Sequence, residues 1–209
     1  MALILFDFDG VLADTLGDML RFAQETCDEL GVKHVVTYED LNSLEVMSFA
    51  EYGRQLEVPE KLLDEFVQRC LKRFEEKQSP PDIFRDLDSV VKELSKNHTI
   101  AIVSGNTMLN VKTFLTQHDL EKCVRAIFGI DAPGSKAEKI SQARKQFAAE
   151  GEAVFMVGDS LSDIRAAKEA SVKSIAVSWG HQTAERLSHA EPDYVVHSPR
   201  ELFELIKNL

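Results

Sequence analysis

The stretch from Leu3 to Thr15, LILFDFDGVLADT, joins a strongly apolar run to two carboxylates. Its beginning, Leu3–Phe6, is bulky and apolar, as expected of a strand that is buried on both faces. Asp7 and Asp9 follow directly, and Gly10 comes next. An Asp-Gly pair is common in simple turns, but a turn alone leaves Asp7 unexplained. We therefore predict that this strand brings two carboxylates to a functional site.

Similar apolar runs recur along the chain and alternate with segments of helical periodicity. In one such segment, Met108, Val111 and Leu115 fall on one face of a helix. Continuously apolar strands that alternate with helices indicate an α/β protein with a doubly wound, Rossmann-like parallel sheet. The predicted strands are Leu3–Phe6, Thr99–Val103, Arg125–Phe128, Val154–Val157, Ser174–Val177 and Asp193–Val196.

One region interrupts this alternation. Residues 16–79 contain no convincing strand but several helical patterns, at Leu20–Leu30, Tyr38–Leu44 and Leu62–Phe74. The region ends at Ser79-Pro80-Pro81, where two consecutive prolines cannot continue a helix. We predict a core domain formed by residues 1–15 and 80–209, with residues 16–79 inserted as a helical domain.

Polar and acidic residues gather after the predicted strands. Ser104-Gly105-Asn106 follow Thr99–Val103, and Gly158-Asp159-Ser160 follow Val154–Val157, with Asp163 shortly after. Ser104 and Asn106 can also serve as helix caps, and Asp163 can complement a helix dipole. Ligands of an open parallel sheet bind beyond the carboxyl ends of its strands. The repetition of this pattern therefore predicts one polar site at that edge.

A cation for this site is expected at the start of a later helix. Ser135-Lys136-Ala137-Glu138 has the pattern of a capping box. A lysine in a first helical turn opposes the helix dipole unless an anion lies nearby, which favours Lys136 over Lys139, one turn further on. Three ionised aspartates against one lysine leave two negative charges. A divalent cation would neutralise them, and all-oxygen donors suit Mg²⁺.

Together these residues resemble the four motifs of the haloacid dehalogenase superfamily of phosphohydrolases. The motifs match in order as Asp7-Phe8-Asp9-Gly10-Val11, Ser104, Lys136, and Gly158-Asp159-Ser160-Leu161-Ser162-Asp163. The helical insert lies where the family places its cap domain. The tail, with Trp179-Gly180 and Pro192-Asp193-Tyr194-Val195-Val196, is similar to the phosphoglycolate phosphatase-like branch. The resemblance implies a Mg²⁺-dependent phosphatase for a small phosphomonoester, phosphoglycolate-like or a sugar phosphate.

The resemblance also implies roles for individual residues. Asp7 would be the nucleophile that forms an aspartyl-phosphate, and Asp9 would be the general acid and base. Mg²⁺ would be held by Asp7, the backbone carbonyl of Asp9 and Asp159. Gly10 and Asp163 would support the site, Asp163 either through water or by orienting the lysine. The phosphate oxygens would be bound by Ser104, Gly105, the amide of Asn106 and Lys136.

Two alternative functions remain beside this one. Sugar phosphomutases of the superfamily share Asp7 and Asp9, but an acidic residue occupies the place of Gly158 in them, so the glycine favours a phosphatase. A phospho-accepting regulatory module without turnover has no use for Asp9 or for a large insert. Substrate choice is expected to depend on the insert, where Arg54 either binds a second anionic group or is a surface residue.

Composition restricts the partners. A net charge of −11 argues against nucleic acid and anionic membranes as partners, and no apolar run approaches a membrane span. Cys27, Cys70 and Cys123 lack metal-binding spacing and are expected to be reduced thiols in a cytoplasmic protein. The six histidines are expected to be surface or packing residues. The sequence gives no indication of oligomeric state.

Overall fold

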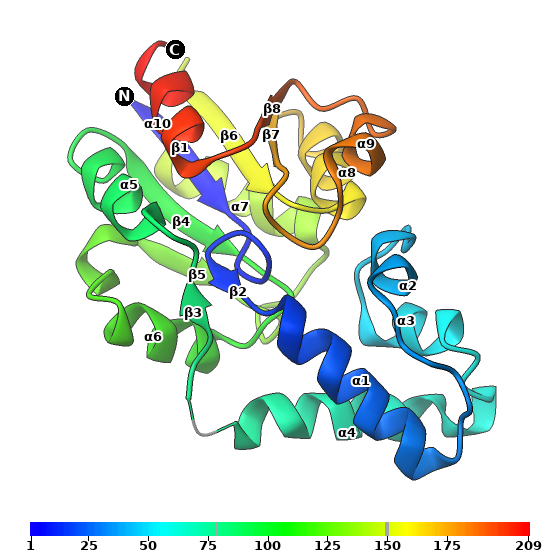
Figure 1. The fold of residues 1–209 in the computed structure, drawn as a ribbon. Helices are drawn as coiled ribbons and strands as arrows, with labels where there is room; N and C mark the ends of the chain where they lie inside the picture. Colours follow the sequence, from blue (N-terminus) through cyan, green and yellow to red (C-terminus); the bar gives the residue numbers. More distant parts are fainter. Residues whose placement is uncertain (78, 149–150) are drawn as a thin grey trace. The chain divides into compact units, whose positions relative to one another are not determined.

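The computed structural model describes residues 1–77, 79–148 and 151–209, and the chain divides into two compact units. Met1–Asp14 and Pro80–Leu209 form the first, called here the core unit. Thr15–Ser79 form the second, the helical unit (Figure 1). Residue 78 belongs to the predicted insert but lies outside the described residues.

The core unit contains a six-stranded sheet with the order β5-β4-β1-β6-β7-β8. Every pair of neighbouring strands in it is parallel, which confirms the predicted α/β class. The predicted strand Thr99–Val103 has the observed bounds, and the others differ by a residue or two. The strands are β1 (Ala2–Phe6), β4 (Thr99–Val103), β5 (Ala126–Phe128), β6 (Ala153–Gly158), β7 (Lys173–Val177) and β8 (Tyr194–Val196).

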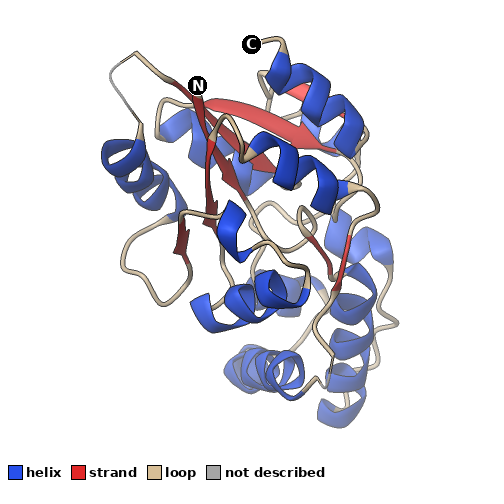
Figure 2. Ribbon diagram, turned by 90° about the vertical axis from the view of Figure 1, so that its left-hand side faces the viewer, coloured by secondary structure: helices blue, strands red, loops and turns tan. Residues whose placement is uncertain are grey.

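Strand β1 lies at the centre of the sheet and is buried on both faces. Leu3 and Leu5 pack into one hydrophobic cluster, together with α7 and α8. Ile4 and Phe6 pack into another, together with α5, α6 and α10. Side chains alternate between the two faces of a strand, so covering both faces requires a continuous apolar run. Helices flank the sheet on both sides (Figure 2).

The helices of the core unit follow the strands in alternation. They are α5 (Leu87–Leu94), α6 (Met108–Gln117), the short 3-10 helix η1 (Glu121–Cys123), α7 (Lys136–Phe147), α8 (Leu161–Glu169), α9 (Ala184–Ser188) and α10 (Pro199–Lys207).

The helical unit has a hydrophobic core of its own. Tyr52, Leu56 and Phe66 are fully buried in a cluster made only of residues from this unit. Helices α1 and α3 both pack against α4. The helices are α1 (Leu16–Leu30), α2 (Tyr38–Asn42), α3 (Phe49–Gln55) and α4 (Glu60–Glu76).

Several short elements were not predicted from the sequence. Helix α3 is seven residues long, and β2 (Ala13–Asp14) pairs antiparallel with β3 (Asp82–Ile83). Strands of two residues are too short to show a period of their own. In the sequence, β2 precedes the helical unit and β3 follows it, so this pairing joins the two ends of the core unit that flank the insert.

Candidate active site

The loop after β1 places the first two carboxylates. The Phe8 carbonyl accepts hydrogen bonds from the backbone N–H groups of Leu12 and Ala13, at 2.9 and 3.0 Å, which folds the chain into a tight turn. The buried Phe8 ring packs edge-on against Phe114, with 5.0 Å between ring centroids. Phe8 therefore anchors the loop in the core, and Asp7 on one side of it and Asp9 on the other enter a polar cluster.

Gly10 allows this loop to approach the rest of the site. Its φ is +76°, which a glycine adopts readily. A Cβ at this position would lie 1.9 Å from Asp159 Oδ2. Both the backbone conformation and the close approach therefore require glycine at this position.

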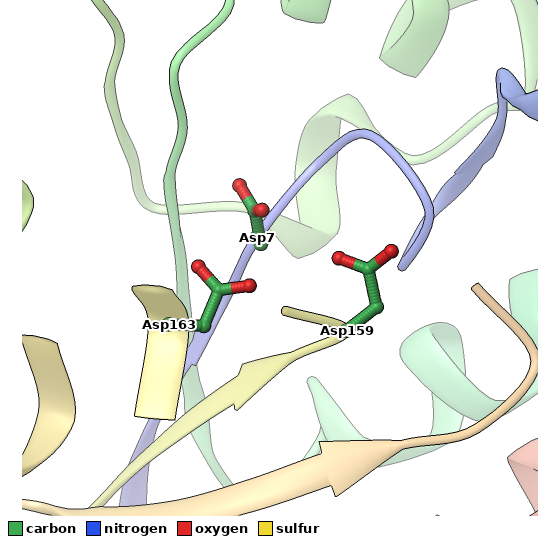
Figure 3. A group of neighbouring side chains, drawn as sticks. All are labelled: Asp7, Asp159 and Asp163. Carbon is green, nitrogen blue, oxygen red and sulfur yellow. The ribbon is translucent and has the colours of Figure 1, made fainter. Parts of the chain in front are cut away.

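Three buried aspartates converge beyond the ends of β1 and β6. Carboxylate oxygens of Asp7, Asp159 and Asp163 all lie within 4.8 Å of one another (Figure 3). Asp159 directly follows β6, and Asp163 lies in the first turn of α8, where it forms a capping box with Ser160. Its Oδ2 accepts hydrogen bonds from the Ser160 N–H at 3.1 Å and hydroxyl at 2.6 Å.

Lys136 supplies positive charge to this cluster. It is the first residue of α7, and the capping box predicted between Ser135 and Glu138 is present. Lys136 Nζ lies 2.5 Å from Asp163 Oδ1 and 3.1 Å from Asp7 Oδ2. Lys139 is buried, and its Nζ donates instead to the Gly129 carbonyl, at 2.8 Å. The geometry thus favours Lys136 over Lys139 as the cation of the site.

Burial and mutual repulsion strongly perturb the acids. Burial raises the pKa of Asp7 well above its usual range, and the neighbouring Asp163 adds to this. The same two causes raise the pKa of Asp159 to about 8. Burial opposes the charge on Lys136, but Asp163 and Asp7 outweigh it and raise its pKa. If all three carboxylates were ionised, they would carry more negative charge than Lys136 compensates, and their buried, all-oxygen donors fit Mg²⁺.

The segment after β4 lies beside Asp9. Ser104 is buried, and its Oγ accepts a hydrogen bond from the Asn106 N–H at 2.9 Å. The Asn106 side chain donates from Nδ2 to Asp9 Oδ2 at 3.1 Å. Gly105, between them, is exposed. The backbone N–H of Asn106, which is expected to bind phosphate, thus donates to Ser104 in this structure. The contact of the Asn106 side chain with Asp9 was not predicted from the sequence.

Arg54 belongs to the helical unit. It lies on α3 and forms exposed ion pairs with Glu51 at 2.6 Å and Glu60 at 3.1 Å. Both partners are in the same unit, so the surface alternative accounts for the observed contacts. A role for Arg54 in specificity stays a prediction.

The loop after β7 contributes His181, which the sequence does not single out, and Trp179, noted in the sequence only for its family resemblance. The His181 N–H donates to Asp159 Oδ2 at 2.7 Å, and its buried ring places Nδ1 3.3 Å from the same oxygen. Trp179 Nε1 donates to the Val11 carbonyl at 3.2 Å. The available signal was position, since His181 follows the end of β7 and therefore lies at the same edge of the sheet.

Comparison with known proteins identifies the family. Residues 4–177 match the model of the haloacid dehalogenase-like hydrolases. The chain belongs to this family. This confirms the resemblance found in the motifs and the prediction of a hydrolase. Among the described residues, no helix is long and apolar enough to cross a membrane.

Curated relatives align over nearly the full chain. A phosphoglycolate phosphatase of Synechococcus elongatus is 25% identical over 100% of this chain and 99% of its own length. Another, of Agrobacterium fabrum, is 29% identical over 93% of this chain and 87% of its own. A pyrophosphatase of Listeria monocytogenes is 24% identical over 98% and 96%, respectively. The similarity to the phosphoglycolate phosphatase-like branch therefore extends from end to end.

Solved structures share the fold. A haloacid dehalogenase-like hydrolase family protein of Streptococcus pneumoniae superimposes with a TM-score of 0.87 at 22% identity, covering 99% of this chain and 98% of its own. A putative haloacid dehalogenase-like hydrolase of Bacteroides fragilis gives a TM-score of 0.85 at 22% identity, over 96% and 99%. The Rossmann-like architecture is thus that of known members of the family.

Proposed function

We propose that the protein is a Mg²⁺-dependent phosphatase that hydrolyses a small phosphomonoester through an aspartyl-phosphate on Asp7. The observation that carries this proposal is the placement of Lys136 between Asp7 and Asp163, with Asp159 beside them, at the end of the central strand. The curated relatives named as phosphoglycolate phosphatases support the reaction class.

The Mg²⁺ site in this proposal uses residues of the buried cluster. Asp7, Asp159 and the backbone carbonyl of Asp9 would hold the ion. Asp163 accepts bonds from Lys136 and Ser160, which supports its role in orienting the lysine rather than in direct ligation. When bound, Mg²⁺ would supply positive charge that favours approach of a carboxylate to an anionic phosphate.

The covalent step belongs to Asp7. One of its carboxylate oxygens forms a bond to phosphorus, and the bond between phosphorus and the alcohol oxygen of the substrate breaks. Asp9, protonated at this stage, gives its proton to the departing alkoxide. Lys136, whose Nζ already contacts Asp7, would bind a phosphate oxygen beside the nucleophile, together with Ser104 and the backbone of Gly105 and Asn106.

Hydrolysis of the intermediate reuses Asp9. Its carboxylate removes a proton from a water molecule, whose oxygen attacks phosphorus. The bond between phosphorus and Asp7 then breaks, which releases phosphate and restores the Asp7 carboxylate. The cycle leaves both aspartates in their original states, as turnover requires.

The substrate is proposed to be a small phosphate ester such as a phosphoglycolate-like compound or a sugar phosphate. Phosphoglycolate phosphatases among the relatives support the first, and the Listeria pyrophosphatase makes pyrophosphate a necessary member of any test panel. The helical unit, which occupies the sequence position of the family's cap domain, is proposed to select the substrate. A phosphomutase would instead yield an isomerised sugar phosphate. A regulatory module would not release phosphate in repeated turnovers.

Release of inorganic phosphate from such a panel tests the proposal. We expect turnover by the wild type, none by Asp7→Asn, because an amide cannot act as this nucleophile, and a loss of about 10²–10⁴-fold for Asp9→Asn. Asp88→Asn, which changes a partly exposed acid on α5, is the matched control and should leave turnover intact. Robust activity in folded Asp7→Asn protein would overturn the assignment.

Metal dependence has a separate test. We expect chelation to abolish turnover and Mg²⁺ to restore it. Isothermal titration calorimetry should detect Mg²⁺ binding to the wild type and much weaker binding to Asp159→Asn, because one ligand charge is lost. Undiminished turnover in excess chelator would show that the protein works without the ion.

A further inference from the structure

The Asn106 side chain connects Asp9 to helix α6. Its Nδ2 donates to Asp9 Oδ2 at 3.1 Å, and its Oδ1 accepts two hydrogen bonds. One comes from the Thr107 N–H at 2.8 Å and the other from Asn110 Nδ2 at 2.9 Å. Asn110, Asn106 and Asp9 therefore form a continuous chain of hydrogen bonds, with donors and acceptors aligned in one direction.

The two donors on Oδ1 fix the orientation of the Asn106 amide. A primary amide has an acceptor side and a donor side. If it were reversed, its oxygen would face the Asp9 carboxylate, and its amine would face two N–H donors. The observed orientation instead presents an N–H to Asp9 Oδ2. This hydrogen bond holds the Asp9 carboxyl group in one orientation within the site.

Asn110 is not needed to start helix α6. Thr107 already caps the helix, with its Oγ1 accepting from the Asn110 N–H at 3.3 Å. In a helix, asparagine is also intrinsically less favourable than alanine. Its spacing of four residues from Asn106 instead brings the two side chains together. The hydrogen bond from the Asn110 side chain to Asn106 thus explains why asparagine stands at a helical position where it is intrinsically unfavourable.

We infer that Asn110, acting through the Asn106 side chain, positions Asp9 for proton transfer to the leaving group. Asn110 is a positioning residue, because it bonds to Asn106 and not to the reacting atoms. The inference rests on the proposed function, since it assumes that Asp9 is the general acid. It assigns to Asn106 a side-chain role beside the phosphate contact expected of its backbone.

The leaving group of the substrate separates this role from a general structural one. An alkyl phosphate releases a strongly basic alkoxide that needs the proton of Asp9, whereas p-nitrophenyl phosphate releases a phenolate that leaves without one. The measurement is the ratio of kcat/KM for an alkyl phosphomonoester to kcat/KM for p-nitrophenyl phosphate. Asp9→Asn removes the general acid itself, so we expect it to lower this ratio the most, by about 10²–10⁴-fold.

Two variants of Asn110 test the relay. Asn110→Ala removes the donor, and Asn110→Asp keeps the shape but places a carboxylate against Asn106 Oδ1, which favours reversal of the amide. We expect the ratio to fall by about tenfold in Asn110→Asp and by less in Asn110→Ala, which is below the loss of about 10²–10⁴-fold expected when the general acid itself is removed. Thr113→Ala truncates an exposed polar side chain one turn further along α6 and should leave the ratio unchanged.

The possible outcomes separate the two hypotheses. A wild type that hydrolyses neither compound nor any member of the small-phosphate panel would refute the proposed function. A wild type that hydrolyses both, with an unchanged ratio in both Asn110 variants, would refute only the relay. An equal loss on both compounds would also refute it, since a structural defect does not distinguish between leaving groups. Asn110→Asp is nearly isosteric, so a folding defect in Asn110→Ala does not prevent the test.

Discussion

Gly158 illustrates how a single residue is required by the packing of the site. A Cβ placed on it would lie 2.2 Å from Asp163 Cβ and 2.5 Å from Asp163 Cγ. Asp163 has little freedom to move away, because Lys136 and Ser160 bond to both of its oxygens. In the sequence, Gly158 favours a phosphatase over a phosphomutase. In the structure it also has a steric role, since any side chain there displaces Asp163.

We therefore expect Gly158→Ala to destabilise the protein by about 1–3 kcal/mol, the usual cost of overpacking. A lower melting temperature by differential scanning calorimetry would report it. The matched control is Gly17→Ala in helix α1, where no described atom lies within 4 Å of the added Cβ. That variant should be neutral or more stable by up to about 1 kcal/mol. An unchanged melting temperature in Gly158→Ala would contradict the steric argument.

Single residues also show how far sequence reasoning extends. The strand-end rule identifies Asp7, Asp9 and Asp159 as candidates, and the capping-box pattern identifies Lys136, because each stands next to a recognisable start or end of an element. Their roles remain proposals. Asn110 and His181 were not identified from the sequence, for physical reasons. A polar residue inside a helix has the pattern of an ordinary solvent-facing position, and a lone histidine after a strand has no partner that the sequence reveals.

At the scale of elements, the last strand of the sheet is held by a reciprocal contact. Asp193 Oδ2 accepts hydrogen bonds from the Ser174 N–H and hydroxyl at 2.9 and 3.0 Å, and Ser174 Oγ accepts from the Asp193 N–H at 3.0 Å. Lys173 Nζ lies 2.6 Å from Asp193 Oδ1. These bonds fix the start of β8 beside β7. Asp193 belongs to the Pro-Asp-Tyr-Val-Val stretch that resembles the family in the sequence. In the structure, this aspartate thus has a structural role, which is to hold β8 beside β7.

This contact predicts a stability difference that depends on pH. Burial opposes the charge on Asp193, but hydrogen bonds from Lys173 and Ser174 outweigh it and hold its pKa below the usual value. Its stabilising effect is therefore complete above the unfolded pKa of about 3.9 and is lost as the pH falls through the folded pKa. We expect Asp193→Ala to lower the free energy of unfolding by about 1–2 kcal/mol at pH 7.

Urea denaturation of wild type and Asp193→Ala at several pH values measures this difference. It should narrow as the pH falls from about 5 toward about 2. Glu204→Ala, which removes an exposed acid from α10, should show almost no difference from wild type at any pH. If the difference in free energy of unfolding between wild type and Asp193→Ala is constant across this pH range, the carboxylate charge is not the cause of the stabilisation.

Elements were predictable where their pattern was long enough to leave no alternative. The strands of the parallel sheet were found because a strand covered on both faces needs an uninterrupted apolar run, as in β1 and β4. The pair β2 and β3 was missed because each strand has two residues. Helix α3 was missed because a seven-residue helix covers only about two turns, too few to establish a period.

At the scale of the whole molecule, the helical unit carries a core of its own. Most of its buried apolar residues form one cluster that contains no residue of the core unit. The core unit buries its apolar side chains in separate clusters on the two faces of the sheet and at α9. An insert with its own core is able to keep its fold without rigid attachment to the sheet. This is a physical condition for the cap role proposed for residues 16–79.

The separation of the cores predicts that damage to one unit stays local. Phe66 is fully buried in the helical unit, and Phe114 is fully buried in the core unit. Replacement of either by alanine should cost about 3–5 kcal/mol through loss of contacts and formation of a cavity. In hydrogen exchange followed by mass spectrometry, Phe66→Ala should reduce protection in α1 and α4 while β1, β4 and β6 keep theirs.

Phe114→Ala is the matched comparison and should give the reverse pattern. It should also reduce turnover more than Phe66→Ala does on p-nitrophenyl phosphate, because Phe8, which anchors the loop between Asp7 and Asp9, packs against Phe114. Equal loss of protection in both units for either variant would show that the two cores unfold as one. The helical unit would then lack the independence that a moving cap requires, while the chemistry assigned to Asp7 and Asp9 would be unaffected.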